Sequence, residues 1–386
     1  MELLNRIEHI GKISERIHIK DKKVFTKCSY SEILGSCTKE KTHYRSVTLN
    51  GDEMAKYIYR SKIERFKEEY SLILDMYLHL ITNILSIHEE IISDIQFVYL
   101  KKIFVDENEM VKDNPYITYM NITINIYDEK GYSKSANFLK NSAKEYIDAM
   151  TNWLMLVEKD LMSTISGRKP SACKILLGNA AVGLMAHELF GHNLETDWYR
   201  ASLDELLDYM PWLTIIDDPC DKNHFLYKYD DLGNLAQKNT LIKNGKIQRY
   251  LNIDFSKGDI LANARAQDYR CVPCTRMSNT YIGAGKSEES ELYDELENGI
   301  VVDSLYNSVS FDKENIYLPV KEAHFNYSGY KLKNVYLRIK NRNMSSVKLG
   351  NIIEIKHMWC NKNGQEVLVG VGGPKILLEK GDILNG

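Results

Sequence analysis

The stretch CKILLGNAAVGLMAHELFGHNLETD, residues 173–197, contains the most informative motif in the second half of this chain. The segment CKILLG predicts a buried strand, and the apolar pattern that follows it predicts a helix. This helix carries His187, Glu188 and His192. In a regular α-helix, residues four apart share a face, but these histidines are five apart and would be rotated by about 140° from each other. Both imidazoles can reach one metal ion only if the helix widens or ends between them.

Gly191, directly before His192, makes such a distortion plausible. Glycine tolerates unusual backbone angles, and π-type turns often occur at functional sites. Glu188, beside the first histidine, is placed to take a proton from a metal-activated water. An ordinary helix without metal explains the spacing equally well, because a catalytic zinc needs a third protein ligand that this segment does not supply.

The rest of the chain predicts an α+β protein with two domains. We expect an N-terminal α/β-type domain with long helices over residues 1–165, and a mostly β C-terminal domain over residues 166–386 that carries the metal-binding helix. SGRKPS, residues 166–171, is the expected linker.

Hydrophobic periodicity and turn residues predict the individual elements. Residues 1–50 predict only short mixed segments. The longer elements expected are a strand and turn over 44–53 with the turn at Asn50-Gly51, a helix from Asp52 to about Ser93, strands over 95–106 and 115–129, a helix over 142–164, and hairpin turns at Asn244-Gly245 and Asn363-Gly364.

The composition is that of an ordinary soluble globular protein. The 386 residues carry a net charge of −3, which gives no global basic field for nucleic acid or anionic lipid. The most apolar long segment, YSLILDMYLHLITNIL, is interrupted by Asp75, His79 and Asn83, so we expect no membrane span. Seven cysteines without an export signal favour reduced thiols and a cytoplasmic location.

Three segments resemble known signature patterns. HELFGHNLETD (187–197) resembles H-E-x-x-x-H-x-L-E-x-D, and YRCVPCTRMSNTYIGAG (269–285) is similar to Y-x-x-x-P-x-x-R-M-x-N-T-Y. MWCNKNGQEVLVGVGGP (358–374) resembles M-C-x-K-x-G-Q-x-V-x-V-G-x-G-x-P. Together, and in this order within residues 172–386, they resemble the signatures of the TldD/PmbA metallopeptidases, in the metal-bearing TldD-like branch of that family. The N-terminal region is shorter than is usual in the family and matches it poorly.

The resemblance implies a zinc site and a general base. Zinc would be bound by His187, His192 and Cys360, and Glu188 would be the catalytic base. A thiolate is a suitable third ligand because it is soft and anionic.

The second segment adds Arg276 and Asn279, which either orient a substrate backbone or carboxylate or brace a turn. Glu195 and Asp197 either fix a histidine tautomer or serve as capping and turn residues.

The resemblance also implies the substrate and the assembly. The family's architecture is a dimer that encloses its active site, so the expected substrate is an unfolded peptide. The partner would be an identical chain or a PmbA/TldE-like paralogue. Family members mature peptide natural products or degrade small peptides, and this chain is expected to do one of these.

Several alternatives stay open at this point. The chain could be a non-hydrolytic assembly subunit with a structural or vestigial metal site, or a metal-dependent amidase that acts on a small substrate. Cys271 and Cys274 form a C-x-x-C pair, which is compatible with redox chemistry or half of a structural zinc site, but the sequence has no second C-x-x-C, and two buried or idle thiols are the favoured interpretation. His357, three residues before Cys360, is a possible substitute ligand.

Overall fold

The computed structural model divides the chain into two compact units, each described here by itself. The first unit contains Met1–Met162, Tyr227–Asn234 and Ala266–Pro273, and the second contains Ser163–Leu226, Leu235–Arg265 and Cys274–Gly386. The residues that the structure describes are 4–21, 23–40, 43–48, 60–84, 88, 90–106, 111–127, 131–162, 172–198, 203–254, 259–332 and 335–385.

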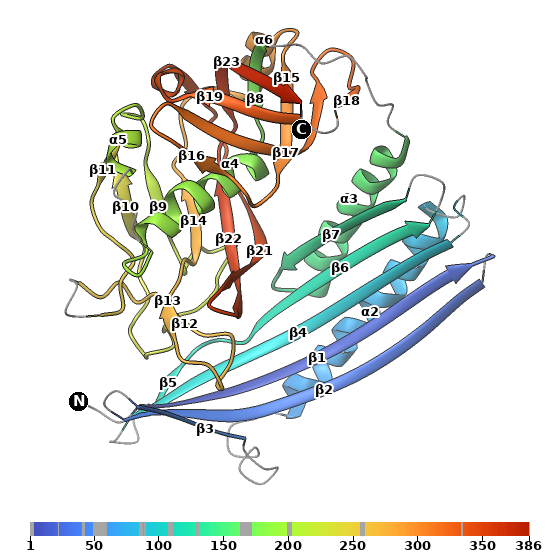
Figure 1. Cartoon of the computed structure of the whole chain (residues 1–386). Helices are drawn as coiled ribbons and strands as arrows, with labels where there is room; N and C mark the ends of the chain where they lie inside the picture. The colour runs from blue at the N-terminus through green and yellow to red at the C-terminus, as the bar shows by residue number, and fades with distance from the viewer. Residues whose placement is uncertain are drawn as a thin grey trace. The chain divides into compact units, whose positions relative to one another are not determined.

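The first unit is a seven-stranded antiparallel sheet with two long helices on one face (Figure 1). The strand order is β3-β2-β1-β4-β6-β7, and β5 pairs with β4. The elements are β1 (Leu4–Lys20), β2 (Lys23–Glu40), β3 (His43–Thr48), α2 (Arg60–Ile84), β4 (Glu90–Asp106), β5 (Val111–Asp113), β6 (Ile117–Tyr127), β7 (Tyr132–Leu139) and α3 (Ala143–Met162).

The helices cover this face because most of the alternate residues of the central strands that point to it are apolar. Ile13 and Ile17 of β1 pack with Phe97 of β4 into a core that also contains Phe66 and Tyr77 of α2. The rings of Phe66 and Phe97 stack with their centroids 4.8 Å apart. This packing fixes the sheet to its helices.

The expectation of short mixed segments over residues 1–50 is wrong. β1 and β2 are long strands that pair in register from Leu4↔Lys39 to Lys20↔Lys23. The alternating pattern of β1 is hidden in the sequence because two positions on its helix-facing side hold polar residues, His9 and Glu15, which are nevertheless buried.

The helix expected from Asp52 to about Ser93 is shorter at its C-terminal end. α2 ends at Ile84, and Glu90–Ser93 already belong to β4. The β-branched pair Ile91-Ile92 suits a strand, and Ile91 is buried in the core. The turn expected at Asn50-Gly51 and the linker expected at 166–171 lie outside the described residues.

The second unit contains a mixed eight-stranded sheet, a mixed six-stranded sheet and a two-stranded ladder. The eight-stranded sheet has the order β15-β8-β23-β19-β17-β16, with β18 paired to β17 and β20 to β23. Its strands are β8 (Ala172–Leu177), β15 (Ile300–Leu305), β16 (Ser310–Phe311), β17 (Asn315–Phe325), β18 (Lys331–Leu332), β19 (Val335–Lys340), β20 (Val347–Leu349) and β23 (Ile376–Asn385).

The six-stranded sheet has the order β11-β10-β9-β14-β22-β21. Two of its strands, β21 and β22, form the hairpin that carries Cys360. Its strands are β9 (Ile215–Asp217), β10 (Asn239–Lys243), β11 (Lys246–Ile247), β14 (Asn279–Ile282), β21 (Glu354–Lys362) and β22 (Gln365–Gly373). The two-stranded ladder pairs β12 (Ala264–Arg265) with β13 (Cys274–Thr275). Two further short helices of this unit are α5 (Leu203–Leu207) and α6 (Glu289–Leu296).

Helix α4 (Asn179–Met185) contacts strands of both large sheets, β15 in one and β22 in the other. Gly183 permits the close approach to β22, because a Cβ at this position would lie 2.7 Å from the backbone nitrogen of Gly372. Val182, Met185 and Leu189 join the main core cluster of the unit. The helix that bears the histidines is therefore fixed by packing from two sides.

The predicted α+β fold class is confirmed, and so are both expected hairpin turns of the second unit. Asn244 and Gly245 have φ values of 50° and 70°, and Asn363 and Gly364 have 55° and 74°. Positive φ at both central residues suits a two-residue hairpin, which explains the Asn-Gly sequences. In the described part of the chain, every helix is too short or too polar to cross a bilayer.

Candidate metal centre

The helix that carries the histidines widens where the spacing requires it. α4 continues into a π-helical segment, Ala186–Gly191, followed by a 3-10 turn, His192–Leu194. The backbone N–H of His192 donates to the carbonyl of His187, five residues earlier. As a result the two imidazole rings lie on the same side, with centroids 4.6 Å apart and planes at 74°.

Gly191 serves this turn through its small size and not through its backbone angles. Its φ of −55° and ψ of −57° are ordinary helical values. A Cβ at Gly191, however, would lie 2.0 Å from the Sδ atom of Met277. The glycine therefore lets the π-helical segment lie directly against the buried side chain of Met277.

The structure brings Cys360 to the two histidines. Cys360 lies two residues before the end of β21, three residues before the turn residue Asn363, and is 5% exposed. Its Sγ is 3.7 Å from Nε2 of His192. One ligand atom from each of His187, His192 and Cys360 lies within 4.8 Å of the others.

His187 provides an independent indication that this group suits a metal ion. Its side chain is fully buried, and neither ring nitrogen has a hydrogen-bond partner among the described residues. Such an unsatisfied buried group costs about 1–3 kcal/mol, which a metal–nitrogen bond would offset. Burial also lowers the pKa of His187 well below its usual range, which keeps the imidazole in the neutral form that ligation requires. Two imidazoles and a thiolate form a donor set typical of zinc.

Glu188 lies beside this group and is partly exposed. Burial raises the pKa of its carboxyl, and the nearby charge of His192 opposes this increase. A carboxylate with a raised pKa is better suited to accept and return a proton near neutral pH.

A buried network of charges surrounds His192. Its Nδ1 lies 3.1 Å from Oε2 of Glu195, whose side chain is fully buried. Nζ of Lys362 donates to the same Oε2 at 2.8 Å and to Oδ1 of Asp197 at 2.7 Å. Burial by itself would lower the pKa of His192, but the hydrogen bonds and charges of Cys360 and Glu195 outweigh it and raise the pKa to about 10.

Arg276 and Asn279 lie within the core of the second unit, not at its surface. Both are at most 1% exposed. The guanidinium of Arg276 donates to the backbone carbonyls of Cys360, Lys362 and Gln365. The amide of Asn279 donates to the carbonyls of Asp218 and His224.

Sequence reasoning did not identify Lys362, although its position offered a signal. In a strand, residues two apart point to the same face. Lys362 follows Cys360 by two residues in β21 and therefore lies on the same side of the strand.

The remaining candidate residues are not members of the ligand cluster. His357 packs its ring against that of His224, with centroids 5.2 Å apart, and does not belong to the three-residue cluster. Cys271 and Cys274 belong to different units, and neither forms a disulfide.

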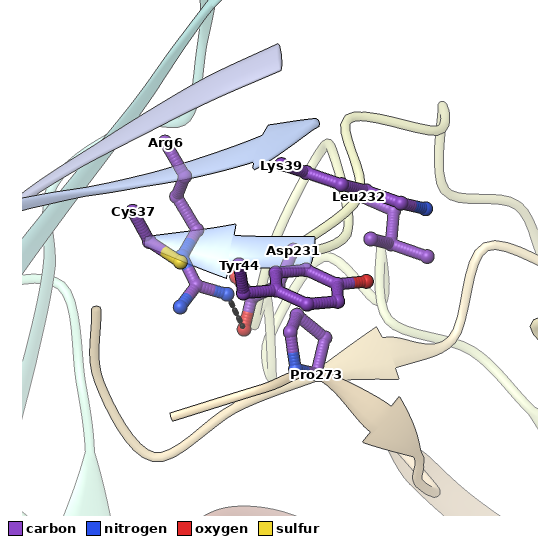
Figure 2. Close-up of a pocket in the computed structure, with 7 residues that line it drawn as sticks. All are labelled: Arg6, Cys37, Lys39, Tyr44, Asp231, Leu232 and Pro273. Carbon is purple, nitrogen blue, oxygen red and sulfur yellow. Dashed lines mark ion pairs between the residues drawn. The ribbon is translucent and has the colours of Figure 1, made fainter. Parts of the chain in front are cut away.

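The first unit has a small pocket of its own (Figure 2), lined by Arg6, Cys37, Lys39, Tyr44, Asp231, Leu232 and Pro273. The guanidinium of Arg6 lies 2.9 Å from the carboxylate of Glu8 and 3.5 Å from that of Asp231. It also donates to the backbone carbonyls of Asp268 and Cys271. Because these contacts bind residues 227–234 and 266–273 to β1, Arg6 has a structural role in this unit.

A His-His-Cys group with two buried members and one half-buried, next to a partly exposed glutamate on an α+β scaffold, is the kind of site that metallopeptidases use. The chain belongs to the TldD/PmbA family: a family model described as "PmbA/TldA metallopeptidase C-terminal domain" matches residues 170–380.

Individual relatives agree with this assignment. A metalloprotease TldD homolog of Buchnera aphidicola subsp. Acyrthosiphon pisum is 29% identical over 251 residues, which cover 58% of this chain and 50% of that protein. A zinc metalloprotease TldD homolog of Saccharolobus solfataricus is 27% identical over 247 residues, which cover 58% of this chain and 54% of that protein. The chain thus spans about half the length of these curated relatives.

A solved structure shares the fold. TldE from Thermococcus kodakarensis superposes with a TM-score of 0.68 over 99% of this chain and 97% of that chain, at 13% sequence identity. The likeness therefore includes both units, although the family model matches only residues 170–380.

Proposed function

We propose that this chain is a zinc-dependent metallopeptidase of the TldD type that cleaves unfolded peptides. His187, His192 and Cys360 would hold the zinc ion, and Glu188 would be the general base. The observation that carries this proposal is the grouping of the three ligand atoms within 4.8 Å of one another, around a buried imidazole with no other partner among the described residues.

The chain's own residues have distinct tasks in this proposal. Zinc supplies Lewis acidity, which lowers the pKa of a water molecule and polarises the substrate carbonyl. Glu188 accepts the proton of the attacking water and then donates it to the nitrogen of the leaving amine. Its raised pKa favours both transfers, because a base whose pKa approaches the working pH exchanges protons readily.

Arg276 and Asn279 would support the site instead of touching substrate. Their side chains are fully buried and donate to backbone carbonyls, which favours the bracing role over substrate binding. Arg276 would hold the hairpin that presents Cys360, since it bonds the carbonyl of Cys360 itself.

The substrate and the assembly are extensions of the same proposal. The substrate would be an unfolded peptide, either a natural-product precursor or a small peptide to be degraded, in the cytoplasm. The enzyme would act as a homodimer or with a PmbA/TldE-like paralogue, and the shared fold with TldE of Thermococcus kodakarensis supports such a partner.

The test combines metal analysis with an activity assay. The purified full chain should contain one zinc ion per chain and should cleave members of an unstructured peptide library, alone or with a candidate paralogue. Glu188→Gln should keep the zinc and abolish cleavage, while Glu354→Gln, an exposed glutamate of β21, should change neither. Cleavage that survives in Glu188→Gln would refute the assigned base, and a protein without zinc would refute the metal centre.

A further inference from the structure

We infer that Lys362 is a positioning residue of the metal centre, which holds Glu195 so that His192 directs Nε2 toward Cys360. This inference rests on the proposed function, because it assigns a task to a residue outside the proposed ligand set. Its basis is a continuous chain of hydrogen bonds within the second unit.

The ammonium group of Lys362 is buried and fully engaged. Its side chain is 2% exposed. Nζ donates to Oε2 of Glu195 at 2.8 Å, to Oδ1 of Asp197 at 2.7 Å and to the backbone carbonyl of Thr275 at 2.9 Å. Because an ammonium has three N–H groups, each of them has one acceptor.

Glu195 transmits this constraint to the metal centre. The same Oε2 that receives Lys362 lies 3.1 Å from Nδ1 of His192. In the neutral imidazole that binds a metal ion, Nδ1–H donates to the fixed carboxylate and the lone pair therefore lies on Nε2. That Nε2 is the atom 3.7 Å from Sγ of Cys360, so the orientation set by the carboxylate is the one that ligation requires.

The position of Lys362 in β21 connects the ligand on this strand, Cys360, with the ligand at the end of the π-helical segment, His192. Lys362 and Cys360 lie two residues apart on one strand, whereas His192 and Glu195 follow the π-helical segment. The strand thus provides one ligand directly and orients another through Glu195. A shift of the hairpin relative to the helix would change both contacts at once.

A purely structural role for Lys362 makes a different prediction. Lys362 also bonds Asp197 and the carbonyl of Thr275, so its loss could weaken the fold without acting through Glu195. A lysine that acts through Glu195 has no further effect on zinc affinity once that carboxylate is removed. A lysine that acts independently has the same effect in either background.

The experiment is a double-mutant cycle on zinc affinity. Apoprotein of the full chain is titrated with Zn²⁺ against a chromophoric chelator, for the unmodified chain, Lys362→Met, Glu195→Gln and the double variant. We expect Lys362→Met to weaken zinc binding about 10–100-fold, the loss typical of partners that orient metal ligands. In the Glu195→Gln background, Lys362→Met should cause no further loss.

A matched control and a spectroscopic readout complete the design. Lys375→Met removes another partly buried lysine of this unit, which pairs with Glu289, and should leave zinc affinity unchanged. In the Co²⁺-substituted protein, Lys362→Met should alter the visible ligand-field bands while thiolate-to-cobalt absorption remains, because Cys360 is intact.

The possible outcomes separate this inference from the proposed function. Unchanged zinc affinity in Lys362→Met, or equal losses in both backgrounds, would overturn the positioning role while the metal centre stands. An unmodified chain that binds no zinc would overturn the metal centre and this inference together. If Lys362→Met does not fold, Lys362→Gln takes its place in the same cycle, since its amide retains a donor without the charge.

Discussion

Replacing Gly191 with alanine tests whether the π-helical segment depends on close packing against Met277. The added Cβ would lie 2.0 Å from Sδ of Met277, and 3.1 Å and 3.3 Å from its Cε and Cγ. Ordinary carbon contacts are about 3.5–4.0 Å, so the overlap exceeds an ångström and the buried methionine must move.

The size of the effect follows from two opposing contributions. Overpacking a core costs about 1–3 kcal/mol, and the middle of that range, about 2 kcal/mol, applies here because the overlapped atoms are the flexible end of a buried methionine. Alanine in place of glycine within a helix recovers up to about 1 kcal/mol. We therefore expect Gly191→Ala to lower the free energy of unfolding by about 1–2 kcal/mol.

The assay is urea denaturation of the apoprotein, followed by circular dichroism. Gly283→Ala is the matched control, because a Cβ there would make only an ordinary contact of 3.4 Å with Thr214. Met277→Ala should relieve the overlap, so Gly191→Ala should cost less in that background than in the unmodified chain. A Gly191→Ala variant as stable as the unmodified protein would refute the argument that space at this position fixes the turn.

Three further predictions concern the metal and pH. Chelation of zinc should abolish cleavage and lower the melting temperature. The far-ultraviolet circular dichroism should stay native, because both units have extensive apolar cores. Unfolding on chelation would show a structural metal instead. Cys360→Ser should keep the fold but abolish thiolate-to-cobalt absorption in the Co²⁺ protein, and an unchanged spectrum would remove Cys360 from the ligand set. Burial lowers the folded-state pKa of His9 despite the opposing bond to Glu32, so the unfolded chain takes up this proton first. The contribution of His9 to the free energy of unfolding is therefore complete above its unfolded pKa of about 6.5 and is lost as pH falls toward the folded pKa. Urea denaturation across about pH 5–8 should show that the free energy of unfolding decreases less at low pH in His9→Gln than in the unmodified chain.

The sequence predicts the local geometry of the site well where a backbone constraint determines the spacing or the type of residues. Five-residue spacing of His187 and His192 requires a widened turn, and the structure has one at Ala186–Gly191. The Asn363-Gly364 pair predicts the hairpin next to Cys360, because few other residues accept positive φ at both positions.

Long-range packing is where sequence reasoning fails. The alternation of β1 is hard to recognise because the polar residues His9 and Glu15 occupy buried positions, and that of β2 because its first ten residues, 23–32, are exposed. The reason for Gly191 was also different from the one expected, since it depends on Met277, which is distant in sequence. Neither case leaves a periodic signal in the local sequence.

The ligands of the candidate centre are widely separated along the chain, and this has a consequence during synthesis. Cys360 follows His192 by 168 residues. A growing polypeptide on the ribosome cannot complete the centre until nearly the whole second unit has been translated. Under the proposed function, nascent chains would thus carry no assembled metal centre, and cleavage would begin only after translation of the chain is almost finished.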